Sequence, residues 1–158
     1  MSADGDTAKT VAAPWGRRIP GETMTDLLTR LTEMLDDLDA DVDETIDLAD
    51  EIAASGDAAM LPRLQAELDR ALVERNAYAR ELLGGVLAAI GGPDALPALL
   101  RASAVDLGDD QDSLAAEIVD LVQADPTRSR ALLEPLTRDD DLTVANRAEW
   151  ALRFLPNA

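Results

Sequence analysis

The 158-residue chain contains no cysteine and no histidine. This excludes disulfide bonds, Cys/His zinc sites, thiol nucleophiles and imidazole bases, and with them most common catalytic arrangements. Lys9 is the single lysine, so the serines lack an obvious lysine base, and the Gly84-Gly85 pair lacks the lysine of a phosphate-binding loop. We therefore expect a protein without enzymatic activity and without a cofactor.

Aromatic residues are scarce, whereas Ala and Leu dominate an apolar content of 47%. This composition favours helices over strands. The richest apolar stretch, Leu82 to Ile90, covers nine residues, and crossing a bilayer needs roughly 18. The first residues also lack the basic and apolar regions of a secretory signal. We expect a cytoplasmic, all-helical protein that does not enter a membrane.

Basic residues are outnumbered, with 14 Lys and Arg against 32 Asp and Glu, which gives a net charge of −18. A charge of this sign repels nucleic-acid phosphates and anionic lipids, so we expect neither as a direct partner. Residues 1–21 differ, because their charged side chains sum to +1: Lys9, Arg17 and Arg18 against Asp4 and Asp6. We predict a flexible basic arm over 1–21 and a helical domain over 22–158.

Apolar residues recur three and four positions apart from Thr23 onward, which is the pattern of helices that bury one face. Thr23 and Asp26 have the spacing of a capping box, and Ser55-Gly56 is a typical helix end. The first predicted inward stripe is Met24, Leu27, Leu28, Leu31, Met34, Leu35 and Leu38. The second is Val42, Ile46, Ala49, Ile52 and Ala53.

The same pattern recurs three more times along the chain, which predicts helical hairpins at about 23–55, 58–90, 94–124 and 127–155. First helices beginning near 23, 58, 94 and 127 give intervals of 35, 36 and 33 residues. Such intervals are typical of helical repeats, whose units bury their apolar faces against their neighbours.

The segment Ile90-Gly91-Gly92-Pro93-Asp94-Ala95-Leu96-Pro97-Ala98-Leu99-Leu100 resembles the turn and early-proline helix of HEAT-type repeats. Near the end of the chain, a second match resembles a terminal second helix: Val144, Arg147, Ala148, Ala151 and Leu152. The resemblance implies a right-handed alpha-solenoid whose second helices line a concave binding face. Gly92 departs from the family pattern, because an acidic residue is common there.

A different fold is also compatible with the first part of the sequence. Apolar spacing from Leu28 to Ile52 continues as a heptad seam, which would make one helix from Thr23 to Ser55. That helix would form a coiled coil or a long antiparallel hairpin, followed by a small helical domain. The Asp39-Ala40-Asp41 stretch instead favours a bend, because it combines poor helix formers with like charges.

Acidic residues are concentrated between Glu33 and Glu51, where ten of nineteen residues are acidic and none is basic. The sequence predicts either a solvated face or a surface for a basic protein partner. Asp39, Asp41 and Asp43 resemble the start of a calcium loop, but the required Gly and final Glu are missing. The candidate partner-binding residues are Asp43, Glu44, Asp47, Asp50, Glu51, Asn76 and Arg80, with Trp15, Arg17 and Arg18 of the arm.

These features favour a non-catalytic protein-binding module over an enzyme. An acidic inhibitor or immunity-type protein is the first hypothesis, because opposite charge speeds the encounter with a basic partner. The alternatives are a scaffold that binds an extended peptide and a helical protein that responds to divalent cations. For the arm, Trp15 and its neighbouring arginines predict either partner docking or folding back onto the acidic first hairpin.

Overall fold

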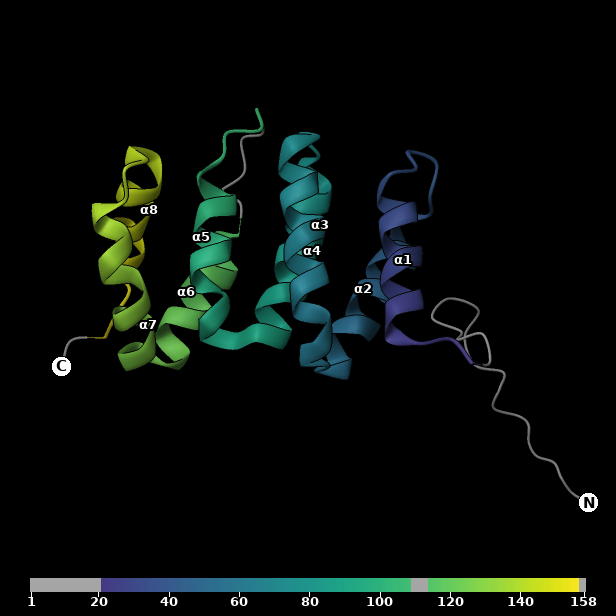
Figure 1. The fold of residues 1–158 in the computed structure, drawn as a ribbon, viewed down its shortest axis with the longest axis horizontal. Helices are drawn as coiled ribbons and strands as arrows, with labels where there is room; N and C mark the ends of the chain where they lie inside the picture. Colours follow the sequence, from purple (N-terminus) through teal and green to yellow (C-terminus); the bar gives the residue numbers. More distant parts are fainter. Residues whose placement is uncertain (1–20, 109–113, 157–158) are drawn as a thin grey trace, which may run out of the picture. The chain divides into compact units, whose positions relative to one another are not determined.

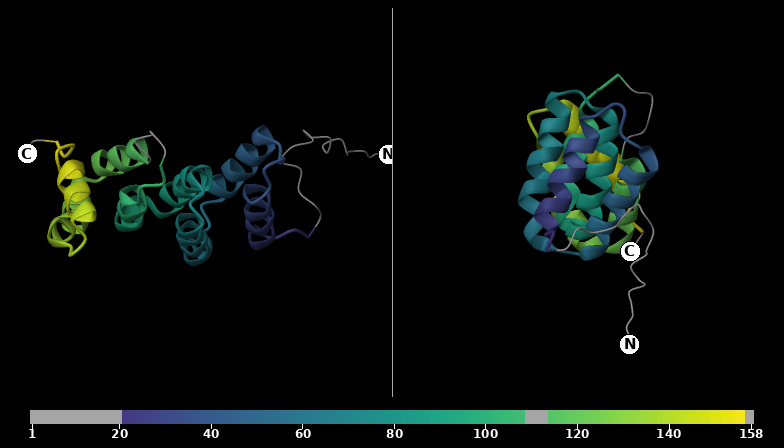
Figure 2. Two further views of the ribbon diagram at one scale, coloured as in Figure 1. Left: turned by 90° about the horizontal axis from the view of Figure 1, so that it is seen from above. Right: turned by 90° about the vertical axis from the view of Figure 1, so that its right-hand side faces the viewer.

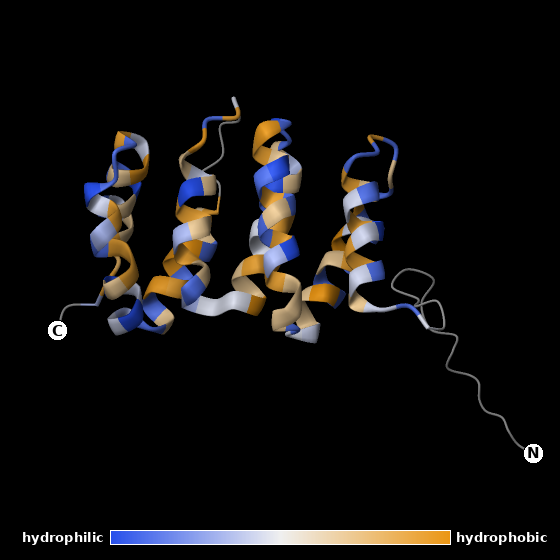
Figure 3. Ribbon diagram, in the orientation of Figure 1, coloured by the Kyte–Doolittle hydropathy of each residue, from blue (hydrophilic) through white to orange (hydrophobic). Residues whose placement is uncertain are grey.

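A computed structural model describes residues 21–108 and 114–156 of the chain. Within these ranges the secondary structure is helical and contains no strand (Figure 1). Hydrophobic and hydrophilic residues alternate along the helices (Figure 3). The predicted all-α fold is confirmed.

The chain divides into two compact units, Met1–Ile52 and Ala53–Ala158. The boundary lies inside α2 (Val42–Ser55). The sequence predicts a single helical domain over 22–158. The boundary between the two units falls near the end of the first predicted hairpin, 23–55. We describe each unit by itself.

Unit 1 begins with α1 (Met24–Leu35), which starts at the predicted capping box. The Asp26 backbone N–H donates to Thr23 Oγ1 at 3.1 Å, and the Thr23 N–H donates to Asp26 Oδ2 at 3.0 Å. The helix ends at Asp36, and α2 begins only at Val42. A continuous helix over 23–55 is therefore wrong, because the chain turns between the two helices and reverses its direction (Figure 1).

The turn also changes which apolar residues between Glu33 and Glu51 are buried. Leu38 was predicted to face inward, yet it lies in the turn and is 100% exposed. On α2 the buried residues are Thr45, Leu48, Ala49 and Ile52. Val42 and Ile46, also predicted inward, are 57% and 37% exposed. Apolar side chains cover nearly half of the α2 circumference, so their spacing alone did not decide which flank is buried.

Unit 2 contains three consecutive helix pairs, with short 3₁₀ turns at Ala58–Met60 (η2), Gly92–Ala95 (η3) and Glu134–Arg138 (η4). The pairs are α3 (Leu61–Val73) with α4 (Ala77–Gly91), α5 (Leu96–Ala104) with α6 (Ala115–Ala124), and α7 (Pro126–Leu133) with α8 (Leu142–Leu152). The α5–α6 pair contacts both α3–α4 and α7–α8 (Figure 2). The right-handed, HEAT-like form of this arrangement stays a prediction.

Polar residues at the helix starts give unit 2 its helix boundaries. The side chains of Asp57, Asn76, Asp125 and Asp141 each accept a hydrogen bond from a backbone N–H of the helix or 3₁₀ turn that follows. These acceptors satisfy N–H groups that the first helical turn leaves without a partner. The predicted helix starts near 58 and 127 fall at these positions.

Gly84, in the middle of α4, allows a close approach between α4 and the residue that precedes α6. A Cβ atom at Gly84 would lie 2.5 Å from Leu114 Cδ2, whereas a Cβ at Gly85 would meet nothing within 4 Å. Leu114 is 1% exposed, and its backbone has a φ of 58°, which is costly for a residue with a side chain. Of the two adjacent glycines, Gly84 is therefore the one that permits close helix packing.

The stretch Ala77–Ala104 is long and apolar enough to cross a membrane by length and composition. The sequence interpretation missed it, because it considered only Leu82 to Ile90. In the structure the stretch is α4, η3 and α5, and the backbone breaks at Gly92 with a φ of 62°. Part of the stretch, including Leu83, Leu96 and Leu99, is buried within unit 2, and 39% of its most apolar window is buried in all.

Candidate functional site

The outward side of α2 carries a row of carboxylates. Thr45, Leu48, Ala49 and Ile52 occupy the buried side, which leaves five acidic residues on the remaining circumference: Asp43, Glu44, Asp47, Asp50 and Glu51. Asp43, Asp47 and Asp50 follow one another at spacings of four and three, so they share one side of the helix. We call the set Asp43, Glu44, Asp47 and Asp50 the α2 acidic face; Asp43, Glu44 and Asp50 are exposed and Asp47 is half-buried.

Exposed apolar side chains border this face. Val42 and Ile46 lie one helical turn apart, Ile46 is also one turn from Asp43 and from Asp50, and Leu38 precedes them in the turn. We call Leu38, Val42 and Ile46 the apolar margin. Single exposed apolar residues are common, but three within nine positions beside a row of charges form a mixed surface. Protein-binding surfaces use this combination of apolar contact and charge.

Among the described residues, no basic side chain forms an ion pair with the α2 acidic face. The stretch Glu33 to Glu51 has no basic residue. Within the described ranges, the ion pairs found elsewhere join arginines to other carboxylates, such as Arg30 to Glu22 and Arg70 to Glu67. Like charges within a screening length of about 8 Å repel one another at physiological salt. A cationic partner would relieve this repulsion.

Glu51 differs from the other predicted acidic residues. It is half-buried, and its Oε1 atom is buried. Because this carboxylate oxygen is buried, Glu51 is not grouped with the α2 acidic face.

Asn76 and Arg80, two of the predicted partner-binding residues, have structural roles. Asn76 Oδ1 accepts from the Ala79 N–H at 3.0 Å and caps α4. Arg80 is 1% exposed, so it is not available to a partner in this structure. Its Nη1 atom donates to the Val105 carbonyl at 2.7 Å and to the Ala102 carbonyl at 3.3 Å. The expectation that Arg80 contacts a partner is therefore corrected.

Three arginines converge on the C-terminal end of α5, a feature that sequence reasoning missed. Arg80 reaches the last carbonyls of the helix, and Arg75 Nη2 donates to the Asp106 carbonyl at 3.3 Å. Arg147 Nε donates to Ser103 Oγ at 3.1 Å, and Ser103 Oγ donates to the Leu100 carbonyl at 2.9 Å. Cations are favourable at this end of a helix dipole. The convergence holds successive helix pairs together and offers no reactive group.

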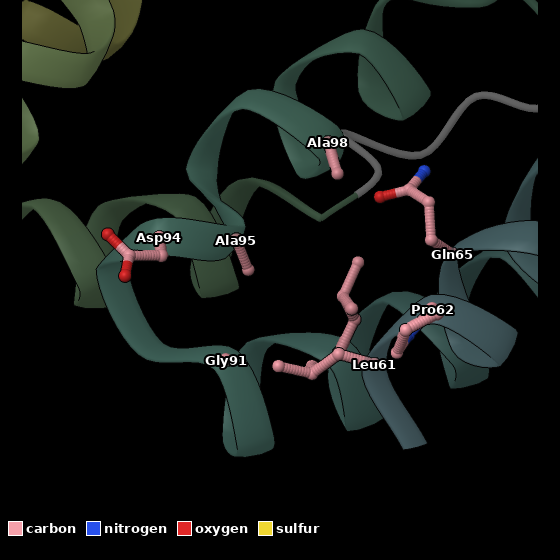
Figure 4. Close-up of a pocket in the computed structure, with 8 residues that line it drawn as sticks. Leu61, Pro62, Gln65, Gly91, Asp94, Ala95 and Ala98 are labelled. Atoms are coloured by element: carbon pink, nitrogen blue, oxygen red, sulfur yellow. The ribbon is translucent and has the colours of Figure 1, made fainter. Parts of the chain in front are cut away.

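A cavity of about 260 Å³ lies within unit 2 beside the start of α3 and η3 (Figure 4). Leu61, Leu87, Ala95 and Ala98 make most of its wall apolar. Gln65 contributes an amide, whereas the Asp94 carboxylate points away from the cavity and accepts from Arg128 Nε at 2.7 Å (Figure 4). A binding pocket normally combines apolar walls with several convergent polar groups. This cavity therefore defines no ligand chemistry.

The acidic residues do not form a metal site in the described part of the chain. No group of three or more His, Cys, Asp or Glu residues there could hold an ion. Asp41, the second position of the calcium-like pattern, accepts from the Glu44 N–H at 2.9 Å and caps α2. Its carboxylate thus satisfies the helix start.

Trp15, Arg17 and Arg18 lie outside the described residues, so their binding to a partner stays a prediction.

Comparison with protein-family models, curated proteins and solved structures found no match for this chain. The resemblance to HEAT-type repeats thus rests on the sequence pattern alone.

Proposed function

We propose that this protein is a non-catalytic binding module, of the inhibitor or immunity type, that recognises a basic protein through the α2 acidic face and its apolar margin. The observation that carries the proposal is the exposure of Val42 and Ile46 on α2, where Ile46 lies one helical turn from both Asp43 and Asp50. On a face that contacts only solvent, these two apolar side chains would contribute no burial of apolar surface. A protein partner can bury them while its cations pair with the carboxylates.

The charge distribution supports fast recognition of a cationic partner. A net charge of −18 attracts a basic protein over distances beyond direct contact, and such steering raises association rates by one to three orders of magnitude at low salt. The apolar margin adds contact area whose contribution does not depend on salt. We therefore expect an interface with a salt-dependent association rate and an apolar, salt-insensitive component.

The test begins with affinity capture from an extract of the native host at low and at high salt, followed by affinity measurement on the purified captured protein. The D43N/D47N/D50N variant should bind about tenfold more weakly at low salt, because three charge pairs are lost. The V42S/I46S variant should also bind more weakly, but with an unchanged salt dependence.

The matched control is D120N/D140N/E149Q, which removes the same number of charges from exposed positions of unit 2. We expect it to reduce binding only slightly, through the weaker long-range field. Equal losses in the two triple variants would contradict the assignment of the binding surface to α2. Recovery of no basic protein at either salt concentration would contradict the proposed partner class.

A further inference from the structure

An apolar row on α2 continues outward from the buried side of unit 1. Successive helix positions are rotated by about 100°, so Val42 and Ile46 lie about 40° apart on the circumference, and Ala49 lies beside Val42 on the side of the core. Ala49 is buried, whereas Val42 and Ile46 are exposed. The three side chains therefore form one apolar row that passes from the core into solvent. We call this row the α2 seam.

The spacing of the α2 seam is that of helices packed side by side. Its residues, Val42, Ile46 and Ala49, are separated by four and three positions. This alternation keeps apolar side chains facing a neighbouring helix that runs alongside. The exposure of Val42 and Ile46 shows that no described part of the chain fully covers the outer end of the seam. The seam thus has room for a further helix.

Two carboxylates flank the seam on its solvent side. Asp43 directly follows Val42, and Asp50 directly follows Ala49, so the two acidic residues are seven positions apart. Both are exposed. In paired helices this flanking position holds the charges that select the partner helix. An occupant of the seam must therefore present cations at intervals of seven residues beside an apolar row of its own.

Other common ways of binding a polypeptide do not fit this surface. An added β-strand needs the edge of a sheet, and the described residues contain no strand. Proline-rich segments bind in aromatic-lined grooves, and residues 21–52 contain no aromatic side chain. Phosphorylated and acidic segments need clusters of arginine, whereas Arg30 is the one basic residue of 21–52 and pairs with Glu22. Helix packing is the remaining mode.

We propose that the α2 seam receives a cationic amphipathic helix, and that the basic partner of this protein presents such a helix. The inference rests on the proposed function and adds the structure of the partner's contact element. The helix lies along α2 at an interaxial distance of about 8–10 Å. Its apolar row covers Val42 and Ile46, and its Lys or Arg side chains pair with Asp43 and Asp50.

Two synthetic peptides separate helix geometry from charge. The ordered peptide has about 20 residues, with leucines alternately three and four positions apart and lysines beside them at intervals of seven. The scrambled peptide has the same composition in an order without helical periodicity, so its net charge is unchanged. We expect the full-length protein to bind the ordered peptide about tenfold more tightly, because it alone can bury an apolar row while its charges pair. Equal affinity for the two peptides would overturn the proposal.

The contribution of the apolar row is tested by substitution within the seam. V42S/I46S should bring the two peptides to equal affinity, because the carboxylates remain while the apolar contact is lost. A melting temperature close to that of wild type shows that the variant is folded. If V42S/I46S is unstable, Ile46→Lys gives a second test, because lysine is a good helix former and its charge repels the ordered peptide. A preference for the ordered peptide that survives both changes would overturn the proposal.

The contribution of the flanking charges is tested with a matched pair of variants. D43N/D50N should weaken binding of the ordered peptide about tenfold at low salt. D120N/D140N removes the same number of charges from exposed positions of unit 2, and we expect it to change the affinity little. Equal losses in the two variants would overturn the pairing of the peptide with the α2 carboxylates.

Failure of the proposed function has a different signature. Binding of the ordered peptide that depends on Val42 and Ile46, without recovery of any basic protein from the native host, would overturn the proposed function and support the seam as a site for cationic helices. Recovery of a basic protein that binds through α2, together with equal affinity for the two peptides, would overturn the helical mode alone.

Discussion

Arg80 shows how one charged side chain can belong to the interior. Its aliphatic stem lies among the buried residues of α4, and its guanidinium donates to two carbonyls at the end of α5. Glu81 Oε2 lies 3.9 Å from Arg80 Nε, so a carboxylate accompanies the buried charge. The side chain thereby links two consecutive helix pairs from a buried position, whereas Arg128, which joins α7 to Asp94, is about half exposed.

Arg80→Met should lower the free energy of unfolding by about 1–3 kcal/mol, because it keeps the stem but removes the donors to the carbonyls of Ala102 and Val105. Arg70→Met is the matched control. Arg70 also makes paired contacts, with Glu67 and Glu74, but its side chain is 39% exposed. Such surface pairs contribute about 0–1 kcal/mol. Equal losses in urea unfolding would show that burial does not distinguish the two arginines.

At the scale of the element, two adjacent glycines in α4 have different roles. Both lower helix stability by about 1 kcal/mol relative to alanine. Gly84 compensates for this cost by letting Leu114 pack against the helix backbone, whereas Gly85 faces open space. The two glycines are equivalent in the sequence. In the fold they have different surroundings, because neighbouring positions on a helix point about 100° apart.

Alanine substitutions at these positions should have effects of opposite sign. Gly84→Ala would place Cβ against the buried Leu114 side chain, and we expect a loss of about 1–3 kcal/mol from overpacking. Gly85→Ala meets nothing within 4 Å, and we expect a gain of up to about 1 kcal/mol. Chemical denaturation of both variants measures the difference; a gain for Gly84→Ala would contradict the close approach of α6.

At the scale of the whole molecule, the net charge of −18 governs how stability responds to salt and pH. Self-repulsion opposes the folded state, so added salt should raise the melting temperature at pH 7. Two carboxyls respond differently at low pH. The pKa of Asp26 is lowered by hydrogen bonds from the Thr23 backbone and side chain, and that of Asp139 by the Asp141 backbone N–H and by Arg101.

A lowered pKa in the folded state means that each carboxylate stabilises the fold above its unfolded pKa, and that this contribution disappears as pH falls through the folded value. For Asp26 the window lies at and below the ordinary value of 3.8. Asp26→Asn should therefore reduce the melting temperature at pH 7, and the difference from wild type should close as pH falls well below 3.8. A difference that persists at pH 2 would contradict the role of the charged carboxylate in the capping box.

Several features of the fold could be predicted from local sequence because they depend on neighbours along the chain. The capping box of Thr23 and Asp26 was predicted and is present. The end of α2 at Ser55, followed by Gly56 with a φ of 61°, was also predicted. Helix caps and left-handed glycines depend on residues within a few positions, so they can be recognised from the sequence alone.

The sequence by itself determined the helical class, the helix ends at residues such as Thr23 and Gly56, and the excess of negative charge. The tertiary structure decided that Thr45 and Leu48 are buried while Val42 and Ile46 are exposed, and that Arg80 is inside. The physical reason is that caps and charge depend on local chemistry. Burial instead depends on which distant surfaces meet, and several faces of a broadly apolar helix can satisfy the same spacing.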